Sequence, residues 1–92
     1  MAEKQQRTVH FSGDVQGVGF RYTTCRVAEG FDVTGTVKNL PDGRVRIVVE
    51  GTAKEIDAFL DKLESRMDRH VRDRNEQTAG ATGKFDGFQV VY

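Results

Sequence analysis

Three glycines lie close together at positions 13, 17 and 19, and Arg21 follows shortly after them. Glycine has no Cβ, so such a segment can turn sharply and bring successive backbone N–H groups into a concave arrangement. A predicted helix follows, and the first N–H groups of a helix have no intrahelical partner. Arg21 at the start of that helix can donate two parallel hydrogen bonds to a phosphate. The pattern favours an anion-binding loop, although a glycine-rich turn beside a solvated arginine would have the same sequence.

The glycine spacing does not match two common nucleotide-binding motifs. A Walker loop continues with Gly-Lys-Ser or Gly-Lys-Thr, and no such tripeptide follows Gly19. The dinucleotide fingerprint needs a Gly-x-Gly-x-x-Gly spacing, which these three glycines do not have. The loop therefore implies neither a nucleoside triphosphate nor a dinucleotide.

The hydrophobic pattern predicts seven elements around this loop. Apolar residues alternate with polar ones at Val9 and Phe11, as in a half-buried strand. An apolar stripe from Ile56 to Leu63 predicts the clearest helix, and Thr52 with Glu55 forms a capping box at its start. The predicted strands are 7–13, 35–40, 44–50, 70–78 and 85–92, and the predicted helices are 21–31 and 53–67. The segment 70–78 is nearly all polar, so we expect it at an edge of the sheet.

This order of elements predicts an α+β fold of the ferredoxin-like type. Two split βαβ units would form an antiparallel sheet with two helices packed on one face (βαββαβ), and a C-terminal strand would be added. The chain of 92 residues is long enough for one domain. We expect residues 1–6 to be a disordered polar leader and residues 7–92 to be that domain.

The composition argues against several classes of partner. Lys and Arg together number 14, as do Asp and Glu, so no net charge favours nucleic acid or an anionic membrane. The single cysteine excludes an intramolecular disulfide and a multi-cysteine metal site. No segment has the pattern of a signal peptide or the length of a transmembrane helix. We therefore expect a cytoplasmic protein that binds no nucleic acid and no membrane.

Other residues with reactive side chains receive structural interpretations. His10 should lie on the surface, and His70 has no second histidine or carboxylate at metal-ligand spacing, so no metal site is expected. Cys25 shares a helical stripe with Ala28 and Phe31, which favours a buried thiol.

Two segments resemble the signatures of a known family. Residues 13–21, Gly-Asp-Val-Gln-Gly-Val-Gly-Phe-Arg, resemble the first signature of the acylphosphatase family, Gly-x-Val-Gln-Gly-Val-x-Phe-Arg, at every fixed position. Residues 35–39, Gly-Thr-Val-Lys-Asn, followed by Gly43, Val45 and Gly51, resemble the second signature at matching spacing. The resemblance extends over nearly the whole chain.

The resemblance implies an enzyme that hydrolyses the carboxyl-phosphate bond of small acyl phosphates. It implies that the loop and Arg21 hold the phosphate while Asn39 orients a water molecule, with no covalent intermediate, no metal and no cofactor. The implied substrate-binding residues are Val15, Gln16, Gly17, Val18, Gly19 and Phe20. Of these, the side chain of Gln16 is expected only to brace the loop. Inorganic phosphate would be the product and a competitive inhibitor, and the chain is expected to be a monomer.

Two positions depart from the family pattern. Thr36 stands where many members have an aromatic residue, so we expect altered packing beside the site. Asp32 stands where glycine commonly ends the first helix, and we expect Asp32 to adopt the left-handed conformation there.

Two other functions fit parts of the sequence. A non-catalytic phosphate sensor would need Arg21 and the glycines but not Asn39. An RNA-binding module would share the topology, but such modules stack bases on aromatic residues of their central strands, and 44–50 contains none.

Overall fold

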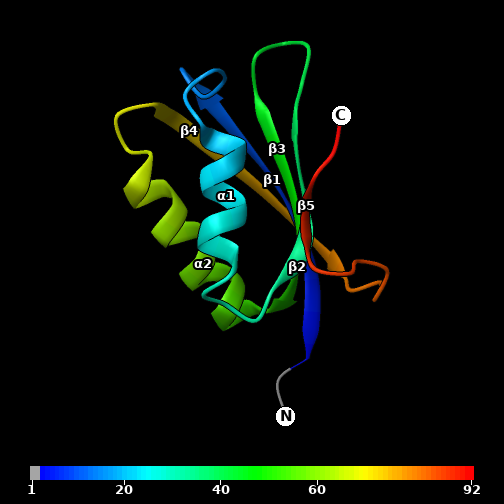
Figure 1. Ribbon diagram of the computed structural model, residues 1–92. Helices are drawn as coiled ribbons and strands as arrows, with labels where there is room; N and C mark the ends of the chain where they lie inside the picture. The colour runs from blue at the N-terminus through cyan, green and yellow to red at the C-terminus, as the bar shows by residue number, and fades with distance from the viewer. Residues whose placement is uncertain (1–2) are drawn as a thin grey trace.

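A computed structural model describes residues 3–92 as a five-stranded sheet with two helices on one face (Figure 1). The strands are β1 (Lys4–Gly13), β2 (Thr34–Asn39), β3 (Val45–Thr52), β4 (Val71–Gly80) and β5 (Phe88–Val90), and the helices are α1 (Phe20–Ala28) and α2 (Ala53–Arg66). The strand order is β4-β1-β3-β2-β5, with the polar strand β4 at one edge. The predicted α+β, ferredoxin-like fold is confirmed.

One strand pairing differs from the fully antiparallel sheet that the sequence predicted. β5 runs parallel to β2, whereas the other three pairs of neighbouring strands are antiparallel. The chain leaves β4 at one edge, passes through residues 81–87 and returns at the opposite edge in the reverse direction (Figure 1). Since β4 and β2 themselves point in opposite directions, a strand that reverses after β4 must be parallel to β2.

The first strand begins earlier than predicted. Residues 4–6, assigned from sequence to a polar leader, pair with residues 50–52 of β3. The side chain of Gln6, on the face opposite Val9 and Phe11, donates to the Glu50 carboxylate at 2.8 Å. The leader prediction is wrong for these residues because hydrogen bonding, not apolar burial, holds this end of the strand. Residues 1–2 of the predicted leader lie outside the described residues.

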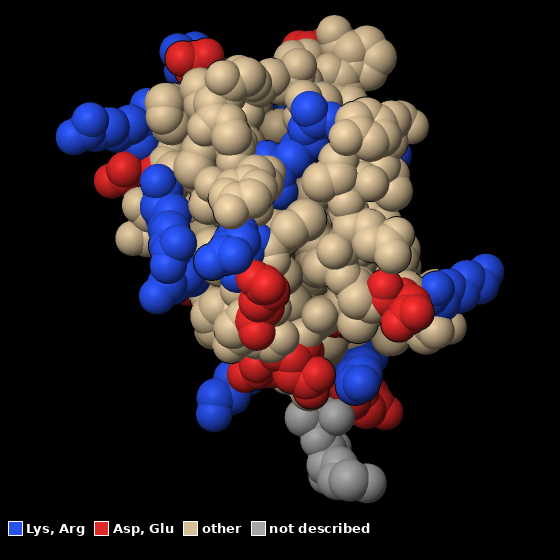
Figure 2. Space-filling view, in the orientation of Figure 1, with Lys and Arg blue, Asp and Glu red and all other residues tan. Residues whose placement is uncertain are grey.

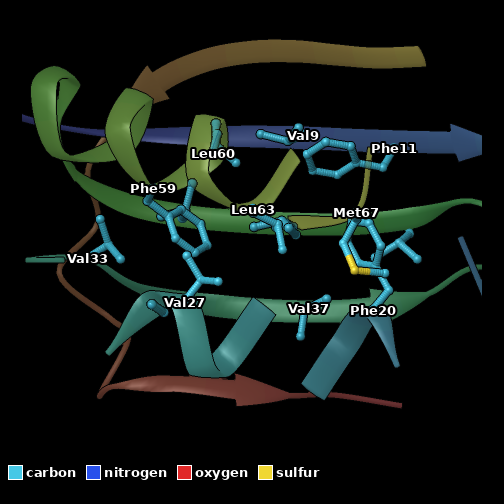
Figure 3. Close-up of a cluster of buried hydrophobic side chains, with 14 of the residues drawn as sticks. Val9, Phe11, Phe20, Val27, Val33, Val37, Phe59, Leu60, Leu63 and Met67 are labelled. Atoms are coloured by element: carbon cyan, nitrogen blue, oxygen red, sulfur yellow. The ribbon is translucent and has the colours of Figure 1, made fainter. Parts of the chain in front are cut away.

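The core lies between the helices and the sheet (Figure 3). The predicted stripe of α2 is buried there: Ile56, Phe59, Leu60 and Leu63 have no exposed surface. They meet the inward faces of the strands, which contribute Val9, Phe11, Val37, Val45, Ile47 and Val49. Burial of each such side chain stabilises the fold by roughly 1.5–3 kcal/mol before entropy is counted. This packing fixes both helices against the sheet.

The end of α1 differs from the prediction. The helix ends at Ala28, and the N–H groups of residues 29–31 bond to carbonyls three residues earlier. No residue other than glycine in 3–92 has a positive φ, so the expectation of a left-handed Asp32 is wrong. The N–H of Asp32 instead donates to the Glu55 carboxylate at 2.8 Å. Tight 3₁₀-type bonds end the helix without a left-handed residue.

The same contact changes the predicted capping box of α2. The Thr52 hydroxyl accepts from the Glu55 N–H at 3.3 Å, which is half of the box. The Glu55 carboxylate bonds to Asp32 rather than back to Thr52. The start of α2 is thereby tied to the segment that leads into β2. Within residues 3–92, neither helix has the length and apolar character needed to cross a membrane.

Candidate active site

The glycine loop joins the end of β1 to the start of α1. Gly17 and Gly19 have φ values of 78° and 79°, in the left-handed region that favours glycine. Gly19 is the N-cap of α1, and no side chain caps the helix there. The first backbone bond of the helix runs from the Thr23 N–H to the Gly19 carbonyl at 2.9 Å. The earlier N–H groups at this helix start are therefore available to an anion.

Gln16 fixes the loop to the hairpin between β2 and β3. Its Nε2 donates to the carbonyls of Leu40 at 2.8 Å and Arg44 at 2.9 Å. At the other end of the loop, the Asp14 N–H donates to the His70 carbonyl at 2.9 Å. The Gln16 side chain therefore braces the loop, as expected, and only its backbone remains for binding an anion.

Three apolar residues of the loop anchor it in the core. Val15 is fully buried, Phe20 is 2% exposed, and Val18 packs partly buried against the same cluster. The Phe20 ring lies 5.2 Å from the Phe11 ring, centroid to centroid. The side chains of Val15 and Phe20 are buried and all three are apolar, so any hydrogen bond to a phosphate must come from their backbone N–H groups. The apolar residues of the motif hold the loop in shape.

Arg21 lies at the start of α1 with its charge unpaired. Among residues 3–92, no ion pair involves its guanidinium. Its Cζ lies 5.3 Å from the centroid of the Tyr92 ring, within the range of a cation–π contact. The ring thus supports the guanidinium without neutralising it.

Asn39 ends β2 on the other side of the braced loop. It continues the alternation of Gly35 and Val37, both buried, so its side chain points to the face that carries the helices. Its Oδ1 is buried and has no hydrogen-bond partner among residues 3–92. Buried polar atoms nearly always have a partner, so this oxygen is placed to accept a hydrogen bond from a small molecule.

A pocket of about 350 Å³ brings much of the predicted site together. Of the predicted site residues, Val15, Gly17, Gly19, Phe20 and Arg21 line it. Asn39 does not line it but lies nearby, because Gln16 ties the loop to the adjacent residue, Leu40. In Figure 1 the start of α1, the β2–β3 hairpin and the C-terminus share one end of the sheet. Figure 2 shows basic atoms in a recess among uncharged residues at this end.

Four residues that the sequence interpretation did not assign to the site also line the pocket: Tyr22, Cys25, Val90 and Tyr92. Cys25 is only partly buried, so the expectation of a buried thiol is wrong in part. Burial, followed by the nearby Glu29 charge, raises the pKa of the Cys25 thiol, which keeps this wall uncharged. The alternation of Val90 and Tyr92 was visible in the sequence, but the position of their strand beside α1 was not.

Neither His10 nor His70 lines the pocket. His10 pairs with Arg46 across the sheet, and its neighbours Val9 and Phe11 face the core, so His10 lies on the face without helices. Burial lowers the pKa of His10, and the charges of Arg44 and Arg46 lower it further. In the part of the chain that the structure describes, no three His, Cys, Asp or Glu side chains gather as a metal site.

Comparison with known proteins identifies the family of this chain. The acylphosphatase family model matches residues 7–90. An acylphosphatase of Paenarthrobacter aurescens is 41% identical over 90 residues, which cover 97% of this chain and 96% of the relative. One of Lactobacillus gasseri is 41% identical over 92% of this chain and 96% of its own. The crystal structure of acylphosphatase from Bacillus subtilis matches with a TM-score of 0.85 at 30% identity, over 96% of this chain and 99% of that one. These names support hydrolysis of acyl phosphates, and the chain belongs to the acylphosphatase family.

Proposed function

We propose that this protein hydrolyses the carboxyl-phosphate bond of small acyl phosphates to a carboxylate and inorganic phosphate. The observation that carries the proposal is the shared pocket of Arg21 with Gly17 and Gly19, at a helix start that no side chain caps. Membership of the acylphosphatase family supports the same reaction.

The loop and Arg21 hold the phosphate in this proposal. Backbone N–H groups of residues 15–20 donate to its oxygens, and the Arg21 guanidinium donates two parallel hydrogen bonds. Charge on these oxygens is redistributed as the phosphoryl group transfers, and donors fixed in advance stabilise that change without reorganising. The contact with the Tyr92 ring supports this role, because it limits the motion of the guanidinium.

Asn39 orients the attacking water. Its buried Oδ1 accepts a hydrogen bond from the water, whose lone pair then points at phosphorus. An amide is not a base at neutral pH, so the proton passes to a phosphate oxygen of the substrate. As the new O–P bond forms, the P–O bond to the acyl group breaks and the carboxylate leaves. A carboxylate is a good leaving group, so this scheme needs no general acid, no covalent intermediate and no metal.

The first experiment is hydrolysis of benzoyl phosphate with a chelator present, comparing the wild-type protein with Asn39→Ala. We expect turnover in chelator and a fall in kcat of about a hundredfold or more in the variant, since misplacing a reacting group costs about that much. Inorganic phosphate should inhibit the wild type competitively and should still bind the variant. Asn75→Ala, an exposed site on β4, is the matched control and should leave kcat unchanged.

The outcomes separate an enzyme from a phosphate sensor. Phosphate binding without turnover in folded wild-type protein would indicate a sensor and contradict the proposal. Turnover retained by Asn39→Ala would contradict the role of Asn39. Hydrolysis in ¹⁸O-labelled water should place the label in phosphate, and label in the carboxylate would contradict attack at phosphorus.

We also propose that the chain acts as a monomer, since every residue assigned to the reaction comes from one chain. Sedimentation at the concentration used for the assay tests this directly. A dimer mass under those conditions would contradict it.

A further inference from the structure

We propose that the groove between α1 and the C-terminal segment binds the acyl group, and that it selects extended, uncharged, apolar acyl phosphates. Short acyl groups, and acyl groups with a second negative charge, would be poorer substrates. This inference rests on the proposed function, because it assigns the non-phosphate part of the same substrate. The phosphate loop supplies one end of the groove.

The groove consists of two adjoining recesses. The pocket at the loop continues along α1, and a second recess of about 250 Å³ follows it. The second recess is lined by Cys25, Ala28, Glu29, Phe31, Val33, Gly87 and Phe88. Cys25 lines both, so the two recesses adjoin at this residue. In the proposed complex the phosphate lies at Arg21 and the acyl group extends past Cys25 into the second recess.

Each wall of the groove presents one face of a regular segment. On α1, Arg21, Cys25 and Ala28 are spaced four and then three residues apart, so they share one face of the helix. On the opposite wall, Tyr92, Val90 and Phe88 alternate along one face of the C-terminal segment.

Residues of α1 and residues of the C-terminal segment line the same parts of the groove in order. Arg21 lies against Tyr92, Cys25 and Val90 both line the first recess, and Ala28 and Phe88 both line the second. From Arg21 to Ala28 the helix rises about 10 Å at 1.5 Å per residue. The walls therefore enclose a path long enough for a medium-length acyl chain.

The charges along the groove favour an uncharged acyl group. Arg21 is the single basic residue among those lining the two recesses of residues 3–92, and it lies at the phosphate end. Glu29 lies at the far end, where its carboxylate would repel a second carboxylate or phosphate. Between them lie Val90, which has no ionisable group, and Cys25, whose thiol stays uncharged because burial raises its pKa.

The first test measures kcat/KM for acetyl, butyryl and hexanoyl phosphate. Each CH₂ fully removed from water raises kcat/KM by about fourfold, and hexanoyl has four more CH₂ groups than acetyl, so even burial of about half of them raises kcat/KM by about tenfold. A six-carbon acyl phosphate ending in a carboxylate should fall well below hexanoyl phosphate. In Glu29→Gln the values of kcat/KM for these two six-carbon substrates should be closer to each other.

The second test closes the junction between the recesses. Cys25→Trp should bring the ratio of kcat/KM for hexanoyl and acetyl phosphate close to one. Arg26→Trp is the matched control, because Arg26 is the adjacent residue of α1, is exposed and lines neither recess. Its replacement also removes the exposed ion pair with Glu29 at 3.8 Å, which does not distinguish two uncharged acyl groups. Arg26→Trp should keep the wild-type ratio.

A binding measurement makes the test independent of the variants and of turnover. Calorimetry with the wild type should show hexylphosphonate binding more tightly than methylphosphonate. Equal affinities, or acetyl phosphate turned over as well as hexanoyl phosphate, would overturn this inference and leave the proposed function standing. Failure to hydrolyse any acyl phosphate would overturn the proposed function and this inference together.

Discussion

On the side of the molecule formed by α2 and β4, charged side chains pair with one another. Arg74 contacts Glu76 at 2.7 Å, Glu64 at 3.0 Å and Asp61 at 3.1 Å. Burial lowers the pKa of Arg74, but the hydrogen bonds to these three carboxylates outweigh it and raise the pKa. Nearby, Arg7 is almost fully buried and contacts Asp57 and Glu76.

On the side formed by α1 and the C-terminal segment, comparable groups remain unpaired. Among residues 3–92, Arg21 contacts an aromatic ring but no carboxylate, and the Asn39 Oδ1 is buried without a partner. Arg7 has only its Nε unpaired, because both terminal nitrogens donate. Paired charges join elements to one another, whereas unpaired polar groups are available to a ligand. The comparison therefore separates groups that hold the fold from the two groups to which we assign a role in the proposed reaction.

The largest expected effect comes from Arg21→Lys. An ammonium keeps the charge but cannot donate two parallel hydrogen bonds to phosphate, so kcat/KM for benzoyl phosphate should fall about a hundredfold or more, or about 3 kcal/mol. The free energy of unfolding should barely change, because Arg21 has no ion pair to lose. Steady-state kinetics and urea unfolding measure the two quantities. Near-normal kcat/KM would contradict the bidentate role.

Arg7→Ala should give the opposite result. Removing Arg7 leaves the Asp57 carboxylate without its arginine partner and takes away one of the two arginines that contact Glu76, so it should lower the free energy of unfolding by about 2 kcal/mol. The cost is below that of a fully buried pair because the Asp57 side chain is 59% exposed. Urea unfolding measures the loss, and kcat/KM of the folded variant should stay within twofold of wild type. A large loss of kcat/KM would contradict the assignment of Arg7 to stability rather than to the reaction.

A smaller effect is expected at Glu50, a paired carboxylate that holds the segment leading to β5. The carboxylate accepts from the N–H groups of Thr82 at 2.8 Å and Gly83 at 2.9 Å, and from Gln6 at 2.8 Å. Burial raises its pKa, but these hydrogen bonds outweigh burial and lower the pKa of Glu50 from 4.5 to about 2.

Because the folded-state pKa is depressed, Glu50 contributes stability above pH 4.5 that is lost as the pH falls towards about 2. Glu50→Gln should therefore cost about 1 kcal/mol at pH 7, and the difference from wild type should shrink across that window. Urea unfolding at several pH values measures this. A difference that does not change with pH would show that the carboxylate charge is not involved.

The smallest effect is expected from Tyr92→Leu. Losing an exposed cation–π contact costs about 0.5–1 kcal/mol, so the inhibition constant of inorganic phosphate should rise about two- to fivefold. Tyr92→Phe keeps the ring and is the matched control, with the wild-type constant expected. Equal constants in all three proteins would show that the ring does not position Arg21.

Much of the fold follows from local patterns in the sequence. The stripe of α2 and the alternation at Val9 and Phe11 depend on neighbouring residues, so they predict the elements that the structure contains. The glycine loop is equally local, since its glycines and Arg21 are contiguous with the start of a helix. Hydrogen bonds between polar side chains that are distant in sequence do not follow from local patterns. The pattern therefore does not predict residues 4–6 as part of β1, because Gln6 bonds to Glu50 only once the sheet has formed.

The sequence by itself predicted the element order and the glycine loop before α1, and its resemblance to the family signatures is the source of the proposal that Arg21 and Asn39 are site residues. Only the tertiary structure decided that β5 runs parallel beside β2 and brings Val90 and Tyr92 to α1. It also decided that Gln16 ties the loop to the hairpin that follows Asn39. The physical reason is the range of the contacts. Glycine conformations and helix starts depend on adjacent residues, whereas the groove forms between segments that only the completed sheet brings together.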